Sequence, residues 1–174
     1  MPRKITLNLA ITVDGRIEGP GGDYSWCFDD GNDYGMTDFL AGIDTLLMGR
    51  GSYETLVRDQ AFHPVFADKT MVVCSRTLDD LPPPARLLKG NAVQAVRALR
   101  EEPGAGIWLF GGAVFTRAML DADLVDELQL AVHPLILGPG KSLFDGVERR
   151  IDLELADAKV HSTGLVMLIY RRKV

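Results

Sequence analysis

Residues 107–115 read Ile-Trp-Leu-Phe-Gly-Gly-Ala-Val-Phe, and this stretch decides the fold. It opens with a short, wholly apolar run that is too short for a helix and typical of a strand buried on both faces. Two glycines follow, and an apolar stripe at helical spacing then begins, formed by Val114, Phe115, Ala118 and Met119. The stretch therefore predicts a strand, a tight turn and a helix in immediate succession.

This strand–turn–helix unit has the features of a phosphate site. A helix that starts directly after a strand presents backbone N–H groups and the positive end of its dipole at the carboxyl edge of the sheet, where phosphate binds without a cationic side chain. Because Gly111 and Gly112 have no Cβ, a ligand can approach the backbone closely, or the chain can take a positive φ. A corner that needs glycine only for its turn explains the same residues, so both interpretations stay open.

Composition limits the class of protein. The chain has 174 residues, 47% of them hydrophobic, which predicts one folded domain over residues 1–174 with a substantial core. The net charge is −5, and the basic cluster at 171–173 is too small to suggest nucleic acid as the main partner. No apolar run approaches the roughly 18 residues of a membrane span. Cys27 and Cys74 lie far apart and in no metal-ligand spacing, so we expect reduced thiols, a cytoplasmic protein and no metal.

Strands and helices alternate along most of the chain. Period-two alternation predicts strands over 4–13 and 126–134, and short apolar runs predict buried strands over 45–48 and 70–74. Helices are expected over 29–42, from Tyr53 after a Ser52 cap, and from Asn91, also a cap, to Glu101. Residues 153–156 and 165–170, separated by a Ser-Thr-Gly turn, predict a final hairpin. The pattern indicates an α/β fold with a mixed, mostly parallel sheet, helices on both faces and a C-terminal antiparallel hairpin.

Three of the predicted strands end in small, polar or cationic residues: Gly49-Arg50-Gly51-Ser52, Ser75-Arg76 and Gly111-Gly112. In an open α/β sheet, ligands lie outside the carboxyl ends of the strands. If these strands are neighbours, turn amides could hold a diphosphate, and Arg50 and Arg76 could grip a further phosphate through their planar forks. An arginine taken alone is more often a solvated surface charge, but two of them, each just past a buried strand, favour a site. The common dinucleotide and nucleotide-hydrolase glycine motifs are absent.

Several of these stretches, in this order, resemble the dihydrofolate-reductase-like superfamily. The resemblance is specifically to the reductase domain at the C-terminal end of bacterial riboflavin-biosynthesis deaminase-reductases, the RibD C-terminal domain family. It covers nearly the whole chain and rests on residues 12–17 (Thr-Val-Asp-Gly-Arg-Ile), 47–54 (Leu-Met-Gly-Arg-Gly-Ser-Tyr-Glu), 72–76 (Val-Val-Cys-Ser-Arg), 108–112 (Trp-Leu-Phe-Gly-Gly), 125–128 (Val-Asp-Glu-Leu), 134–140 (Pro-Leu-Ile-Leu-Gly-Pro-Gly) and 143–144 (Leu-Phe).

The resemblance implies a three-layer dihydrofolate-reductase-like fold and an NADPH-dependent oxidoreductase. By the same resemblance, the residues that would select the adenosine 2′-phosphate of NADPH are Gly49, Arg50, Ser52, Ser75 and Arg76. Those that would hold the diphosphate are Gly111, Gly112, Ala113 and Val114, next to Phe110, which is also expected to contact the cofactor. Ala10 and Ile17 would flank the nicotinamide. Ala113 stands where the family often has a third glycine.

Dihydrofolate reductases carry a buried carboxylate early in their first helix, and counting back from Gly49 places Asp33 there. In an apolar pocket such a carboxyl group has a raised pKa and suits proton relay, which makes Asp33 the catalytic candidate. A surface capping role explains Asp33 equally well. Trp26, Phe28 and Phe39 could hold a flat heterocycle, or could instead cover the edge of the core. His133 is expected at a strand end that faces either the site or the core.

The zinc deaminase motifs of the riboflavin enzymes, H-x-E and P-C-x-x-C, do not occur here. The chain thus resembles only the reductase portion, which would transfer a hydride to a small cyclic or ribosyl substrate similar to 5-amino-6-(5-phosphoribosylamino)uracil. Dihydrofolate reduction and a non-catalytic nucleotide-binding module are the alternatives. The resemblance also suggests a homodimer. The apolar hairpin residues 165–170 could supply its surface, or could be buried in the chain's own sheet.

Overall fold

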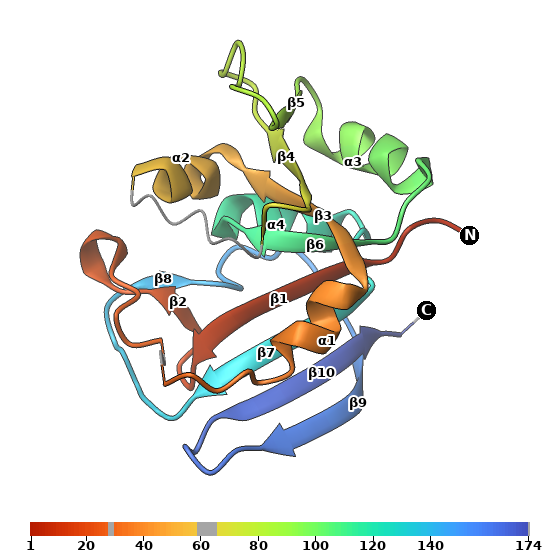
Figure 1. The fold of residues 1–174 in the computed structure, drawn as a ribbon. Helices are drawn as coiled ribbons and strands as arrows, with labels where there is room; N and C mark the ends of the chain where they lie inside the picture. Colours follow the sequence, from red (N-terminus) through yellow and green to blue (C-terminus); the bar gives the residue numbers. More distant parts are fainter. Residues whose placement is uncertain (28–29, 59–65, 174) are drawn as a thin grey trace.

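The computed structural model describes residues 1–27, 30–58 and 66–173. Its strands and helices alternate in the first two thirds of the chain and give way to strands at the end (Figure 1). The elements in order are β1 (Ile5–Thr12), β2 (Arg16–Glu18), a short 3₁₀ helix (Pro20–Gly22), α1 (Met36–Ala41), β3 (Ile43–Gly49), α2 (Arg50–Arg58), β4 (Thr70–Cys74), β5 (Arg86–Leu88), α3 (Ala92–Glu101), β6 (Gly106–Gly111), α4 (Ala113–Asp121), β7 (Glu127–His133), β8 (Lys141–Ser142), β9 (Leu153–Val160) and β10 (Val166–Arg172).

The main sheet has eight strands in the order β5-β4-β3-β6-β1-β7-β10-β9. The first six strands of this order, from β5 through β4, β3, β6 and β1 to β7, pair in parallel. Strand β10 pairs antiparallel with both β7 and β9. The short strands β2 and β8 form a separate antiparallel pair beside the sheet. The predicted mixed, mostly parallel sheet with a C-terminal antiparallel hairpin is confirmed.

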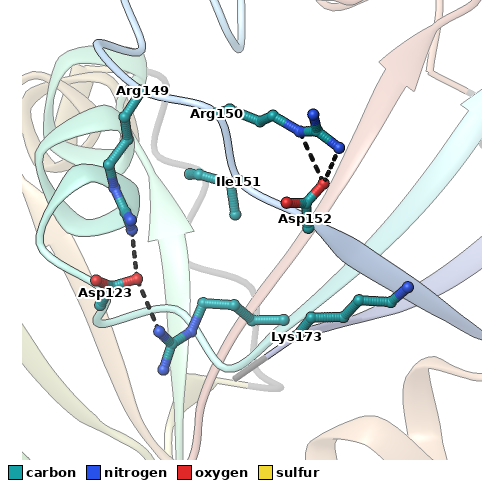
Figure 2. Close-up of a pocket in the computed structure, with 7 residues that line it drawn as sticks. Asp123, Arg149, Arg150, Ile151, Asp152 and Lys173 are labelled. Carbon is teal, nitrogen blue, oxygen red and sulfur yellow. Dashed lines mark hydrogen bonds and ion pairs between the residues drawn. The ribbon is translucent and has the colours of Figure 1, made fainter.

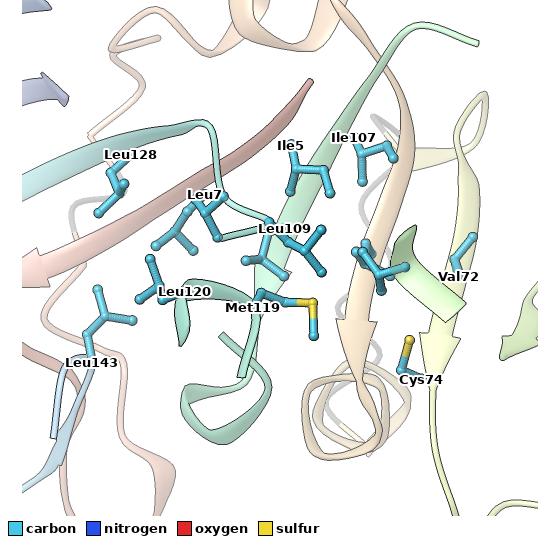
Figure 3. Packing of buried hydrophobic residues seen from close by; sticks show 14 of the residues in the cluster. Ile5, Leu7, Val72, Cys74, Ile107, Leu109, Met119, Leu120, Leu128 and Leu143 are labelled. Carbon is cyan, nitrogen blue, oxygen red and sulfur yellow. The ribbon is translucent and has the colours of Figure 1, made fainter. Parts of the chain in front are cut away.

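Two hydrophobic cores lie on opposite faces of this sheet. On one face, Leu7 and Leu109 of the central strands pack against Met119 of α4 and, further along, against α3 (Figure 3). On the other face, Leu46 and Trp108 pack with residues of α1 and α2. Neighbouring strand residues point to opposite faces, so adjacent positions such as Trp108 and Leu109 belong to different cores. Helices on both faces are therefore confirmed, in three layers.

Local details differ from the sequence prediction at three places. The helix expected over 29–42 begins only at Met36, because Tyr34 (φ 51°) and Gly35 (φ 87°) take left-handed conformations that a helix cannot contain. Helix α2 already begins at Arg50, so the prediction that Ser52 caps it is wrong. Val114 is 73% exposed and does not belong to the apolar stripe of α4. By contrast, Asn91 does cap α3, since its side chain accepts a hydrogen bond from the Gln94 N–H.

Among the helices that the structure describes, none combines the length and the apolar character needed to cross a membrane.

Candidate functional site

Three strand ends meet at one edge of the sheet. Strand β3 lies between β4 and β6, and the register pairs Gly49 with Cys74 and Met48 with Gly111. The residues that follow these pairs, Arg50 on one strand and Ser75 on the next, therefore leave the sheet at the same level. The sequence predicted this convergence only on the condition that the three strands are neighbours, and the structure meets that condition (Figure 1).

The glycine pair closes tightly onto the first turn of α2. Gly111 has a φ of 140° and Gly112 a φ of 91°, a region that side chains rarely enter. A Cβ at Gly112 would lie 3.2 Å from the Ser52 Oγ, so the two helix beginnings are in contact. Gly49 is also confined, because a Cβ there would lie 3.0 Å from the Cβ of Phe115. The positive φ expected for these glycines is confirmed, and the approach of a ligand to their backbone stays a prediction.

The two arginines are exposed at this edge. Arg50 forms an exposed ion pair with Glu54, one turn along α2, over 3.6 Å. Such a pair between exposed side chains contributes at most about 1 kcal/mol and is easily exchanged for a phosphate. Arg76 follows directly after β4, and within the described part of the chain its guanidinium has no ion pair. Both cations are therefore available to an anionic ligand.

Ser75 has a different environment from the arginines. Its side chain is buried, and its Oγ accepts hydrogen bonds from the N–H groups of Thr77 (3.1 Å) and Leu78 (3.0 Å). These bonds shape the turn that presents Arg76. The hydroxyl thus has a structural task in this turn.

The residues at the start of α4 differ in their exposure to solvent. Ala113 is buried at 7% exposure, so the structure accommodates a methyl group where the family often has glycine. Val114 extends outward, and Phe110, just before the glycines, is half-buried among aromatic rings. The first N–H groups of a helix have no partner inside it, which leaves this end of α4 able to bind an anion.

Asp33 does not lie in an apolar pocket. Its carboxylate is exposed and accepts hydrogen bonds from the N–H and hydroxyl groups of Thr37 and from the Gly35 N–H. The hydroxyl of Thr37 is the main cause that lowers the Asp33 pKa, contrary to the raised pKa expected from the sequence. Asp33 therefore stabilises the turn before α1, whose N-cap residue is Gly35.

The aromatic candidates separate into two groups. Phe39 packs edge-on against Trp108 with ring centroids 5.2 Å apart, and Trp108 also meets Phe66 and Phe110. The Trp108 indole is anchored by a hydrogen bond from its Nε1 to the Asn8 carbonyl oxygen (2.9 Å). These rings form an aromatic wall on the α1–α2 face that ends at Gly111. Phe28 lies outside the described residues.

Trp26 approaches the same edge further along the sheet. Its ring meets the His133 imidazole at 5.3 Å and an interplanar angle of 85°. His133 ends β7, pairs in register with Thr12 at the end of β1, and is only 3% exposed. Burial lowers the His133 pKa, and the charge of Asp30 counteracts this in part. The sequence left open whether His133 faces the site or the core. In the structure it is a buried residue at the carboxyl end of β7.

The two residues expected beside the nicotinamide lie near the end of β1. Ala10 is half-buried in β1, opposite Ala131 of β7. Ile17, in β2, packs against the core on the α3–α4 face. The nearby Asp14 was not singled out by the sequence, although the Asp-Gly turn was visible. Its carboxylate accepts N–H bonds from Leu137 (3.1 Å) and Gly138 (2.8 Å), and so joins the loops after β1 and β7.

Comparisons with known proteins identify the family and the fold of this chain. The family model of the RibD C-terminal domain matches residues 3–167. YyaP of Bacillus subtilis strain 168, an uncharacterised protein, is 37% identical over 178 residues, which cover 97% of this chain and 94% of YyaP. A crystal structure of a Shewanella sp. PV-4 protein, provisionally named for riboflavin biosynthesis, has a TM-score of 0.86 at 25% identity and 100% coverage of both chains.

Two further solved structures show the same fold. The deaminase/5-amino-6-(5-phosphoribosylamino)uracil reductase of Thermotoga maritima has a TM-score of 0.76 at 17% identity, over 99% of this chain and 57% of that one. Dihydrofolate reductase from Enterococcus faecalis, solved with NADP(H), has a TM-score of 0.73 at 17% identity, over 98% of this chain and 97% of that one. Together with the family match, they show that this chain belongs to the RibD C-terminal domain family and has a dihydrofolate-reductase-like fold.

Proposed function

We propose that this protein is an NADPH-dependent reductase that transfers a hydride to a small cyclic or ribosyl substrate of the 5-amino-6-(5-phosphoribosylamino)uracil class. The observation that carries the proposal is that the neighbouring strands β4, β3 and β6 end side by side. Arg50, Arg76 and the Gly111–Gly112 pair lie at these strand ends. Family membership and the reductase names of two structural neighbours support the same reaction type.

The residues at this edge fit an NADPH molecule. At Gly112, a side chain would press against Ser52, so the backbone here is open to a diphosphate only because the residue is glycine. The N–H groups at the start of α4 would hold that diphosphate. Arg50 and Arg76 would bind the 2′-phosphate, which distinguishes NADPH from NADH. When bound, the cofactor supplies the hydride, and the protein supplies orientation and charge.

The aromatic wall would form the substrate side. Phe110 presents a half-buried ring next to the glycine pair, and its edge-to-face packing against the buried Trp108 fixes its orientation. Such a surface aligns a flat ring and excludes water from the reacting atoms. Asp33 is exposed and ionised, so we leave it outside the proposed site. His133 is buried beside Trp26 at the carboxyl end of β7.

The cofactor assignment is tested by thermal unfolding with NADPH and with NADH. We expect NADPH to raise the Tm more than NADH does, and the Arg50→Ala/Arg76→Ala double variant to remove that difference. Each charged hydrogen-bond partner contributes about 1.5–3 kcal/mol, so the NADPH Kd should rise at least tenfold. Lys159→Ala, at the far end of β9, is the control and should keep the preference. An unchanged preference in the double variant would contradict the assignment.

The reaction type is tested by turnover. With saturating NADPH, we expect loss of nicotinamide absorbance when the pyrimidine substrate is added. Dihydrofolate reduction is the second candidate, favoured by the likeness to the Enterococcus enzyme. Turnover of dihydrofolate but not of the pyrimidine would select it. Cofactor binding without turnover of either substrate would instead show a nucleotide-binding module.

A further inference from the structure

A second site lies away from the strand ends that carry the candidate cofactor residues. Figure 2 shows a cavity of about 520 Å³, lined by Asp123, Arg149, Arg150, Ile151, Asp152, Arg172 and Lys173. Because β10 runs antiparallel to β7 and Arg171 pairs with Glu127, the end of β10 lies beside the start of β7. The cavity is therefore at the amino edge of the parallel strands, roughly 20 Å from the carboxyl edge for a seven-residue strand.

The described residues that line this cavity carry an excess of positive charge. Three arginines and one lysine face two aspartates, a net charge of +2 in a chain whose net charge is −5. Asp123 is shared by two guanidinium groups, those of Arg149 and of Arg172. Arg150 is paired with Asp152 over 2.7 Å. Among the described residues, no carboxylate pairs with the Lys173 ammonium.

The hydrogen-bond donors of these arginines are only partly used. Each guanidinium offers five N–H donors in a planar fork. Arg149 donates to the Leu120 carbonyl oxygen (3.1 Å) and to Asp123, while Arg172 donates to Asp123 over 2.7 Å. A single carboxylate therefore serves two forks that could together bind a dianion such as phosphate. Figure 2 shows the Arg149 guanidinium directed at the Asp123 carboxylate.

An apolar cavity adjoins the cationic one. It has a volume of about 270 Å³ and shares Arg149 and Ile151 with it. Its other lining residues are all aliphatic or aromatic: Leu120, Leu128, Phe144, Val147 and Leu153. Ligand sites typically combine such an apolar wall with a few convergent polar groups.

We propose that these two cavities form one binding site for a phosphorylated small molecule with an apolar body. The phosphate is held by Arg149 and Arg172, which converge on Asp123, and the apolar part lies along Ile151. This site is independent of the proposed reductase function, because it shares no residue with the strand ends that carry it.

The test measures binding of phenyl phosphate and inorganic phosphate by calorimetry. The protein carries Arg50→Ala and Arg76→Ala throughout, so that phosphate binding at the candidate cofactor edge is removed. We expect phenyl phosphate to bind at least fivefold more tightly than inorganic phosphate, since it also fills the apolar cavity. Arg172→Gln and, separately, Arg149→Gln should each weaken phenyl phosphate binding at least fivefold. Lys159→Gln makes the same charge change at the far end of β9 and should leave binding unchanged.

Asp123→Asn gives an opposite and more specific expectation. It removes the carboxylate that competes for both arginines, so phenyl phosphate should bind at least threefold more tightly. Asp123 has a left-handed φ of 59°, which asparagine tolerates well, so the backbone should be retained. The proposal is overturned if phenyl phosphate does not bind, if it binds no better than phosphate, or if Asp123→Asn weakens binding in a variant whose circular dichroism matches the parent protein.

Discussion

At the scale of single residues, Gly112 shows how a sequence motif can have two causes at once. Its φ of 91° excludes most side chains, and the Ser52 Oγ lies 3.2 Å from where a Cβ would be. Glycine is therefore needed for the backbone conformation and for the contact with α2. Neither cause requires a ligand, but both leave the backbone amides accessible to one.

Replacing Gly112 by alanine should be costly. We expect Gly112→Ala to lower the free energy of unfolding by about 1–3 kcal/mol, because it forces a side chain into a left-handed conformation. Urea denaturation measures this. Gly51→Ala is the matched control, since Gly51 lies in α2 with open space around its Cα. There alanine should stabilise the protein by about 0.5–1 kcal/mol. Equal stability of Gly112→Ala and the parent would refute the argument.

Asp33 shows where residue counting fails. The gap-free count from Gly49 placed Asp33 early in the first helix, but α1 begins at Met36. Asp33 therefore lies in the turn before the helix, where its carboxylate is used by Thr37 and by Gly35. The sequence contained both possibilities, and only the hydrogen-bond partners separate them.

At the scale of elements, Asp14 joins two loops that border the candidate site. It follows β1, and its carboxylate accepts N–H bonds from Leu137 and Gly138, which follow β7. The Thr12 hydroxyl also donates to it, over 2.6 Å. These hydrogen bonds, led by that of Thr12, lower the pKa of Asp14 to about 2. The carboxylate is thus an acid-sensitive link between two strand ends.

The pH dependence of this link has a defined sign. Because the folded-state pKa is about 2 and the ordinary value is 3.8, the stabilisation is complete above pH 4 and is lost as the pH falls toward 2. We expect Asp14→Asn to have a lower Tm than the parent at pH 6, and the difference to shrink between pH 4 and pH 2. Thermal unfolding followed by circular dichroism at each pH measures this. A difference that stays constant over that range would show that ionisation of Asp14 is not responsible.

At the scale of the whole molecule, the two outermost strands of the sheet, β5 and β9, differ. Strand β5 at one edge has three residues, whereas β9 at the other has eight and is exposed along nearly all of its length. In the described chain, β9 pairs with β10 alone, so its outer backbone groups are free to pair with another strand. Leu155 is 53% exposed and Val160 is 75% exposed, which makes this edge open to association. The half-buried β10 is already part of the chain's own sheet.

This edge leads us to expect a homodimer formed through β9. Light scattering coupled to size-exclusion chromatography should give about twice the chain mass of 19.1 kDa. Leu155→Lys should shift the protein toward the monomer, because a charge at this edge disfavours strand pairing. Ile136→Lys is the control: Ile136 is 76% exposed but lies in the loop after β7, and its replacement should leave the mass unchanged. A monomeric parent protein would contradict the expectation.

The sequence alone determined the local elements and the type of fold. The apolar run before Gly111 became β6, the run at 70–74 became β4 with the predicted bounds, and Asn91 capped α3. Short-range physics controls these features: buried strands need continuous apolar residues, and caps need a side-chain acceptor next to free N–H groups. For the same reason the alternation of strands and helices was enough to predict a mixed sheet.

Only the tertiary structure decided which strand ends meet and which charged groups face each other. Gly49, Cys74 and Gly111 lie side by side because of the register of β3 with β4 and β6. This register pairs residues up to about sixty positions apart in the sequence. The approach of Arg172 to Asp123 likewise depends on the antiparallel return of β10 along β7. Sequence patterns report the surroundings of a residue along the chain, whereas these contacts arise from long-range pairing that no local pattern encodes.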